Sequence, residues 1–326
     1  RRRAALADGG VTRYPGVFAE GLKAALAAYQ GVPIAALTTG CGSDDLIDSI
    51  VRAFCEPGDR LALPVPTFAM VPTFARMNGV APVPCPGGPG GEPDVEALLA
   101  TDARLIYLCR PNNPTGVSMA RATVEALVRR APGVVLLDEA YAEFAGDDFL
   151  REAVGTERLI VLRTFSKAWG LAGLRIGYAT GPPALIAEVE KSRGPYKVNG
   201  PAEAAAVAAL GADRGWLNEI VRRTVEARAW LTARLVERGL APWPSAANFV
   251  AVPLPSGCGA EAMATRLRGL GVAVRPCPGL PGGVEALRVT VGPLDQLEIF
   301  LAAFDRALRD TKTTPPARSL EVNACE

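Results

Sequence analysis

The segment 164–178 holds a lysine among groups that together suit an aldehyde and a phosphate. Lys167 follows the hydroxyls of Thr164 and Ser166 and precedes Arg175. A lysine amine condenses with an aldehyde when burial or nearby positive charge lowers its pKa. Arginine offers a planar fork of donors to phosphate oxygens. An aldehyde and a phosphate on one small molecule describe pyridoxal phosphate, although a basic surface loop would have the same residues.

The segment 39–45 is a glycine-bearing turn that opens into an expected helix. Gly42, Ser43 and Asp44 lie at this transition, and we expect Ser43 to cap the helix. The free N–H groups and the dipole of a helix N-terminus attract anions. Because Asp44 and Asp45 already satisfy the dipole, a phosphate would have to bind backbone N–H groups. An ordinary capped helix is the alternative.

Asn113 follows the apolar stretch 105–109 and is held by Pro114. Open α/β sheets bind ligands at the carboxyl ends of their strands. The Asn113 amide could therefore donate to a phenolic oxygen such as O3′ of pyridoxal phosphate, and it could also contact the substrate. The alternative is a common Asn-Pro-Thr-Gly turn.

Asp138 ends the apolar stretch 134–138, and Tyr141 follows three residues later. A buried carboxylate is costly unless it is paired. A protonated pyridine nitrogen would be a useful partner, because it lets the ring accept electrons. Tyr141 could give O3′ a second hydrogen bond. A helix N-cap is the alternative for Asp138.

Composition restricts the chemistry that these residues can perform. The 326 residues include seven cysteines without a C-x-x-C pair and no histidine. The missing histidine removes Ser–His and Cys–His nucleophile pairs and the zinc sites that use histidine, so we expect no metal. Acid–base chemistry must come from lysine, tyrosine or carboxylates.

Charge and hydropathy indicate where the protein works. The formal net charge of +1 argues against a nucleic-acid partner. No apolar run approaches the roughly 20 residues that span a membrane, and no leader is evident. We therefore expect a cytoplasmic protein without membrane contact, whose cysteines are mostly small buried hydrophobes.

Apolar stretches alternate with helical patterns, which indicates an α/β fold with a mainly parallel sheet. Shorter α+β units after about 238 predict a second, smaller domain. We expect loops at the Pro/Gly-rich stretches 84–93 and 276–283, and a flexible tail from Thr311. The expected strands are 60–65, 105–109, 134–138, 159–163, 175–179, 249–253, 272–275 and 286–291. The expected helices are 43–54, 118–131, 183–194, 201–211, 214–238, 260–270 and 295–309.

The order of these motifs resembles that of fold-type I, pyridoxal-phosphate-dependent aminotransferases, and especially the histidinol-phosphate aminotransferase family. The order is glycine turn, Asn-Pro, Asp-x-x-Tyr, Ser-Lys and Arg. Three further elements extend the resemblance from about Arg13 to Gly292: Arg13-Tyr14-Pro15, Pro66-Thr67-Phe68 and Leu287-Arg288-Val289-Thr290-Val291-Gly292.

The resemblance implies roles for three more side chains. Tyr14 would reach the cofactor phosphate of a partner subunit, so the enzyme would be a homodimer with shared active sites. Phe68 would stack on the pyridine ring, where many relatives have tyrosine. Arg288 would hold the substrate α-carboxylate, on the strand face opposite Leu287 and Val289.

Two features depart from the family pattern. Arg110 stands where the family usually has asparagine. The family also usually carries a longer segment before Arg-Tyr-Pro that covers the substrate pocket. Here residues 1–12 precede it, and we expect either a truncated chain or a different cover. Arg110 and Arg275 are candidates to hold a phosphorylated substrate.

The resemblance implies an enzyme that moves an amino group between an L-amino acid or amino-alcohol phosphate and a 2-oxo acid. Histidinol phosphate and 2-oxoglutarate are the first choice. The alternatives are a phosphothreonine decarboxylase, an aromatic or specialised-pathway aminotransferase, and a non-enzymatic pyridoxal-phosphate-binding protein. The implied organisation is an N-terminal segment (1–29), a large cofactor domain (30–205), a small domain (206–311) and a flexible tail (312–326).

Overall fold

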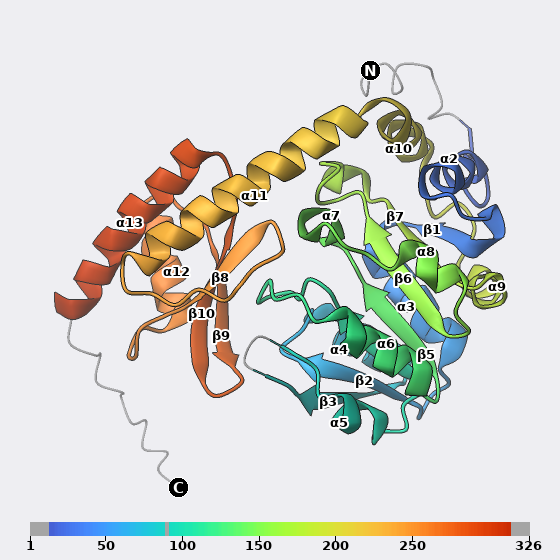
Figure 1. Cartoon of the computed structure of the whole chain (residues 1–326), viewed down its shortest axis with the longest axis horizontal. Helices are drawn as coiled ribbons and strands as arrows, with labels where there is room; N and C mark the ends of the chain where they lie inside the picture. Colours follow the sequence, from blue (N-terminus) through green and yellow to red (C-terminus); the bar gives the residue numbers. More distant parts are fainter. Residues whose placement is uncertain (1–12, 89–90, 314–326) are drawn as a thin grey trace, which may run out of the picture.

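The computed structural model describes residues 13–88 and 91–313, and its main feature is a seven-stranded sheet (Figure 1). The strand order is β1-β7-β6-β5-β4-β2-β3. The pairs between β3 and β6 are parallel, whereas β7 runs antiparallel to both of its neighbours. The strands are β1 (Leu37–Gly40), β2 (Arg60–Val65), β3 (Ala81–Pro86), β4 (Leu105–Cys109), β5 (Val134–Asp138), β6 (Leu159–Thr164) and β7 (Gly177–Thr180). The expected α/β fold with a mainly parallel sheet is confirmed.

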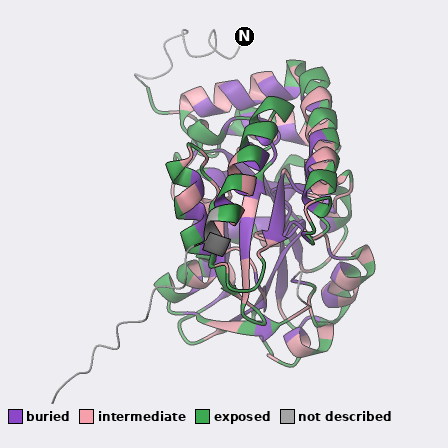
Figure 2. Cartoon of the chain, turned by 90° about the vertical axis from the view of Figure 1, so that its left-hand side faces the viewer, coloured by how far each residue is buried: buried purple, intermediate pink, exposed green. Residues whose placement is uncertain are grey.

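Helices cover both faces of this sheet, so its strands are buried on two sides (Figure 2). Along β5, Val135 and Leu137 pack into one apolar cluster, while Val134 and Leu136 pack into another. This alternation explains why the strand reads as a continuous apolar run. One face is covered by α2 (Glu20–Gln30), α6 (Arg121–Arg130) and α10 (Gly200–Ala212), and the other by α3 (Gly42–Phe54), α4 (Met70–Met77) and α9 (Pro183–Ser192). Shorter helices are α5 (Val95–Leu99), α7 (Ala142–Ala145) and α8 (Leu150–Val154).

A second, three-stranded antiparallel sheet follows in the order β8-β10-β9. The long helix α11 links the two sheets (Figure 1), because Leu217 packs in a core of the first sheet and Leu231 in the core of the second. The elements of this part are α11 (Arg214–Val236), β8 (Phe249–Pro253), α12 (Ala260–Gly269), β9 (Arg275–Leu280), β10 (Val284–Thr290) and α13 (Leu294–Thr313). The expected domain boundaries stay a prediction.

Two stretches expected to be loops contain edge strands. β3 (Ala81–Pro86) extends into the proline-rich stretch 84–93, and β9 (Arg275–Leu280) occupies the first part of 276–283, so the strand expected at 272–275 begins only at Arg275. Both strands pair on one side alone. A proline is tolerated there, because it need not donate to a second neighbour. Proline content was therefore the wrong signal for a loop.

Strand β1 and the beginning of α3 also differ from expectation. β1 occupies Leu37–Gly40, and α3 starts at Gly42 after Cys41, so Ser43 lies in the first turn and is not the cap. Asp45 takes the place of a capping residue, since its Oδ2 accepts the Cys41 N–H at 3.0 Å. A carboxylate one turn into a helix satisfies a free N–H as well as a cap residue does.

The C-terminal helix is longer than expected. α13 continues to Thr313, whereas the tail was expected from Thr311. The remaining tail (314–326) and the segment 1–12 lie outside the described residues. Among the helices of the described part, none is both long and apolar enough to cross a membrane.

Candidate active site

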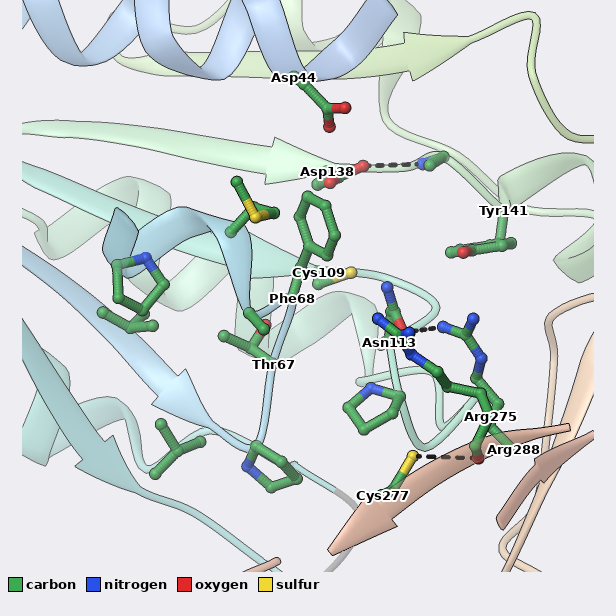
Figure 3. A pocket seen from close by; sticks show the side chains of 18 of the residues that line it. Asp44, Thr67, Phe68, Cys109, Asn113, Asp138, Tyr141, Arg275, Cys277 and Arg288 are labelled. Atoms are coloured by element: carbon green, nitrogen blue, oxygen red, sulfur yellow. Dashed lines mark hydrogen bonds between the residues drawn. The ribbon is translucent and has the colours of Figure 1, made fainter. Parts of the chain in front are cut away.

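A cavity of about 1010 Å³ lies between the carboxyl ends of the large-sheet strands and strand β9 of the small sheet. Figure 3 shows Asp138, Tyr141, Phe68, Asn113 and Arg288 around this space. The structure brings together most of the residues predicted from the sequence. The cavity is lined by Ser43, Asp44, Phe68, Asn113, Asp138, Tyr141, Thr164, Ser166, Lys167, Arg175, Arg275 and Arg288.

Lys167 lies in the turn after β6 and is the one lysine among the described residues that line the cavity. The turn is fixed by Thr164, whose Oγ1 accepts the Ser166 N–H at 3.1 Å and donates to the Ile176 carbonyl at 3.3 Å. Water reaches the lysine through the cavity, but the surrounding protein reduces the hydration of its amine. This desolvation, followed by the positive charge of Arg288, lowers the pKa of Lys167. A larger share of neutral amine leaves Lys167 available to act as a nucleophile.

Asp138 ends β5 with both carboxylate oxygens held. Tyr107 donates its hydroxyl to Oδ2 at 2.7 Å, and the Ala140 N–H donates to Oδ1 at 3.0 Å. Burial raises the pKa of Asp138 to about 6, and the Tyr107 hydrogen bond partly counteracts this rise. The carboxylate is thus held rigidly and is ionised above about pH 6.

Tyr107 was missed from the sequence. It lies in β4 directly opposite Leu136, close to the Cys109–Asp138 pair, and is fully buried. A tyrosine in a buried apolar strand generally needs a partner for its hydroxyl. That signal was available, but only the strand register identifies Asp138 as the partner.

The end of the cavity that was expected to bind a phosphate is formed by the turn at Gly42 and by Arg175. A Cβ at Gly42 would lie 2.6 Å from the Arg175 guanidinium, and one at Gly177 would lie 2.6 Å from the Ser43 nitrogen. Only glycines allow this close approach. Arg175 itself has φ 53°, which is unusual for a residue with a side chain. Its Nη2 lies 3.3 Å from Asp44 Oδ2.

Arg288 lies on the cavity face of β10, as its alternation with buried Leu287 and Val289 predicted. Its Nη1 donates to Asn113 Oδ1 at 2.5 Å, and its guanidinium carbon lies 5.0 Å from the Phe249 ring centre. The buried Nε has no hydrogen-bond partner. A buried donor without a partner costs free energy, so an anion at this position would be stabilised.

Two predicted residues lie elsewhere. The guanidinium of Arg110 points away from the cavity and bonds to Asp147 Oδ2 at 2.5 Å and to the Met119 carbonyl at 2.9 Å. Arg110 is therefore wrong as a substrate ligand. Tyr14 is 84% exposed and stacks on Tyr196 with ring centres 4.9 Å apart, outside the cavity of its own chain.

The residues of the cavity fit pyridoxal phosphate. Gly42 has no Cβ, so the Arg175 guanidinium can approach the turn closely. A phosphate could bind there between this guanidinium and the backbone N–H groups at the start of the helix. The held carboxylate of Asp138 suits a protonated pyridine nitrogen, and Lys167 suits the aldehyde. Asn113 accepts from Arg288 through its oxygen, so its amide nitrogen remains able to donate to a phenolic oxygen.

Replacing Asp138 by asparagine should stabilise the cofactor-free protein above pH 6. The pKa of Asp138 rises on folding from 3.8 to about 6, so the folded state binds more protons than the unfolded state between these values. Its contribution to the free energy of unfolding therefore falls as pH rises through this window. Asparagine removes this pH-dependent loss, which is worth up to roughly 3 kcal/mol. Its single acceptor oxygen can serve only one of the two donors at Asp138, which offsets part of the gain equally at every pH.

The measurement is urea unfolding of both cofactor-free proteins from about pH 4.5 to 8, a range that covers most of this window and the pH values above it. Asp295→Asn, at an exposed aspartate, is the matched control and should show no comparable pH-dependent gain. A gain for Asp138→Asn that is equal at all pH values would contradict the shifted pKa.

Comparison with known proteins agrees with this geometry. Residues 1–304 match the family described as aminotransferase class I and II. The histidinol-phosphate aminotransferase of Roseiflexus castenholzii is 42% identical over 86% of this chain and 76% of its own length. The aromatic amino acid aminotransferase of Corynebacterium glutamicum strain R is 40% identical over 91% of this chain and 85% of its own.

Solved structures give the same fold. The histidinol-phosphate aminotransferase of Sinorhizobium meliloti, in complex with pyridoxal-5′-phosphate, has a TM-score of 0.87 at 30% identity and covers 95% of this chain and 87% of its own. The fold is thus that of fold-type I enzymes. The chain belongs to the class I and II aminotransferases and is a pyridoxal-phosphate-dependent transaminase.

Proposed function

We propose that the amino donor is histidinol phosphate and the acceptor is 2-oxoglutarate. The observation that carries this proposal is the pairing of Arg275 and Arg288, which lie directly opposite each other on β9 and β10 and both line the cavity. Like charges opposite each other destabilise a sheet. A dianionic phosphate between them would offset that repulsion and match two guanidinium forks.

The chemistry of the two substrates supports one shared anion site. Histidinol phosphate has no carboxylate, and its phosphate is attached next to the amine-bearing carbon. A 2-oxo acid has its carboxylate next to the reacting carbon. Arg288 would bind either anion in turn, while Arg275 would strengthen binding of the larger one.

The catalytic roles follow from the cavity geometry. Bound pyridoxal phosphate supplies the aldehyde and the electron-accepting ring. Lys167 would hold the aldehyde carbon and, once displaced, move the substrate proton with its Nζ. Asp138 would hold a proton on the pyridine nitrogen, since it is ionised above about pH 6. Asn113 and Tyr141 would donate to O3′, and the ring of Phe68 would pack on the pyridine face.

The phosphate of the cofactor would lie at the other end of the cavity. The backbone N–H groups at Ser43 and Asp44 and the side chains of Ser166 and Arg175 surround that end. Thr164 would act by fixing the Ser166 backbone. Arg175 would exchange its contact with Asp44 for the phosphate, which is the stronger bidentate partner.

A further phosphate ligand would be Tyr14 of a second copy, so the active enzyme would be a homodimer. Tyr14 and its neighbours Val17 and Phe18 are exposed large hydrophobic residues, together with Tyr196. Such a contiguous exposed apolar surface is typical of a protein interface. The free thiols of the described cysteines suit a reducing cytoplasm.

An aromatic amino acid is the second candidate donor, because apolar side chains also line the cavity. Met70 and Leu280 could pack against an aromatic ring. A phosphothreonine decarboxylase would use the same cofactor residues and differ in the bond that breaks.

A half-reaction screen tests the proposed donor. The purified enzyme is mixed with histidinol phosphate, phenylalanine, tyrosine or phosphothreonine, and conversion of the cofactor to pyridoxamine phosphate is followed by absorbance. We expect histidinol phosphate to give the highest kcat/KM, and Lys167→Ala to show no conversion. Faster conversion with an aromatic amino acid would reassign the donor, and carbon dioxide release from phosphothreonine would indicate a decarboxylase.

Arg288→Lys should raise KM for the amino donor and for the oxo acid alike. Lysine keeps the charge but loses the bidentate fork. The expected loss is about 2–3 kcal/mol, or about 30- to 150-fold in kcat/KM. Steady-state kinetics of both half-reactions measure it, and cofactor affinity should remain nearly unchanged. Unaltered kinetics would place the substrate anion elsewhere.

Hybrid dimers test the shared site. An inactive Lys167→Ala protomer mixed with a Tyr14→Phe protomer should form hybrids in which one site carries neither lesion. Activity of the mixture should then exceed that of the two parent dimers combined. A mixture without this gain, or a monomer at assay concentration, would exclude the role of Tyr14 in trans.

A further inference from the structure

Lys197 makes an ion pair with the cofactor turn although it does not line the cavity. It lies in the segment 193–199, between α9 and α10, and its Nζ donates to Asp45 Oδ1 at 2.6 Å. The side chains of Lys197 and Asp45 are 27% and 14% exposed. This partial burial makes the pair stronger than a surface contact.

Asp45 transmits this contact to the backbone of the turn. Its second oxygen, Oδ2, accepts the Cys41 N–H at 3.0 Å. A Cβ on Gly40 would lie only 2.8 Å from the same oxygen, so the carboxylate lies directly against the turn. Lys197 therefore fixes the carboxylate that fixes the Cys41–Gly42 backbone, where the cofactor phosphate is expected.

The ion pair also reduces the negative charge beside the turn. Asp44 and Asp45 both lie in the first turn of α3, where a phosphate dianion would meet two negative charges. Arg175 pairs with Asp44, but both side chains are about half exposed, at 45% and 44%. Lys197 offsets the more buried charge, that of Asp45. Without it, Asp45 would repel an anion within one helical turn.

The same segment contacts a neighbour of the expected phosphate site. Asn199 Nδ2 donates to the Leu174 carbonyl at 3.5 Å, directly before Arg175. Tyr196 stacks on Tyr14, the side chain proposed to reach the phosphate site of a second copy. The segment 193–199 thus lies beside Arg175 of its own site and beside the residue offered to the other one.

We propose that Lys197 is a positioning residue for the cofactor phosphate: it neutralises Asp45 and so keeps the turn at Gly42 ready for an anion. This inference rests on the proposed placement of the phosphate at that turn. It concerns a side chain that touches neither cofactor nor substrate, and it acts entirely through Asp45.

Equilibrium binding to the cofactor-free protein tests the proposal. The probe is pyridoxamine 5′-phosphate, which binds without a covalent bond, and pyridoxamine is the phosphate-free comparison. Lys197→Met should raise the Kd for pyridoxamine phosphate about tenfold, equivalent to about 1.4 kcal/mol, with little change for pyridoxamine. Lys197→Arg should remain within about threefold of the wild type, because it keeps the charge.

The double variant Lys197→Met/Asp45→Asn separates this mechanism from others. With the carboxylate removed, no charge is left unpaired, and the amide oxygen of the introduced asparagine can still accept the Cys41 N–H. Affinity should therefore recover to within about threefold of the wild type, and Asp45→Asn alone should bind at least as tightly as the wild type. The matched control is Lys191→Met, which removes an exposed lysine on α9 that pairs with Glu188; it should bind like the wild type.

Three outcomes would overturn the proposal: an unchanged Kd for Lys197→Met, a double variant as weak as the single one, or an equal loss of affinity for pyridoxamine. Thermal unfolding of each variant identifies a loss that comes from misfolding, and the double variant then decides. A wild type that does not prefer pyridoxamine phosphate over pyridoxamine would instead contradict the proposed phosphate site itself.

Discussion

A buried carboxylate at the end of β5 is the constraint on which the active-site end of the sheet depends. Asp138 is only 4% exposed, and its charge would be very costly without partners. Tyr107 and the Ala140 N–H supply two hydrogen bonds, which still leave the pKa raised to about 6. The remaining cost can be offset by a cation in the cavity. A protein that keeps such a group gives up stability in its empty state in return for binding a cationic ring nitrogen.

A cluster of buried charged residues lies at the same strand ends, on the side that faces away from the cavity. Glu139 is fully buried, and its carboxylate lies 3.3 Å from Arg163 and 3.9 Å from Arg110. The Phe149 N–H donates to it at 3.1 Å. Burial outweighs these cations and raises the pKa of Glu139 to about 8. Because β4, β5 and β6 each contribute or adjoin one member, the cluster ties together the three strand ends that present Asn113, Asp138 and Lys167.

This cluster explains the unusual residue at position 110. Arg110 stands where the resemblance led us to expect asparagine, and its guanidinium bonds to Asp147 while lying 5.3 Å from the Phe149 ring centre. It therefore stabilises the loop between α7 and α8 behind the site. The sequence alone could identify Arg110 as an unexpected residue. It could not show where the side chain points, because a residue just beyond a strand end can face either side of the sheet.

The sequence was sufficient to predict those strands whose apolar pattern follows from burial on both faces. β4 and β5 were predicted with their observed bounds, because central parallel strands are continuous apolar runs. The alternation of Arg288 with the apolar Leu287 and Val289 correctly predicted that its side chain faces the cavity. Edge strands β3 and β9 were missed because their prolines imitate loops. The Tyr107–Asp138 and Lys197–Asp45 contacts join residues 31 and 152 positions apart, so they depend on register and packing that no local pattern encodes.

Positive charge gathers at the cavity although the whole chain carries a formal net charge of only +1. The charged residues that line it are Lys167, Arg76, Arg175, Arg275 and Arg288, against Asp44, Asp138 and Glu261. Arg288 has a double effect in this set, because its charge also lowers the pKa of Lys167. An anion bound to Arg288 would offset that charge and let the pKa of Lys167 rise. The smaller, charge-dependent part of the shift would therefore be relieved on binding, whereas the larger part, which comes from desolvation of the amine, would remain.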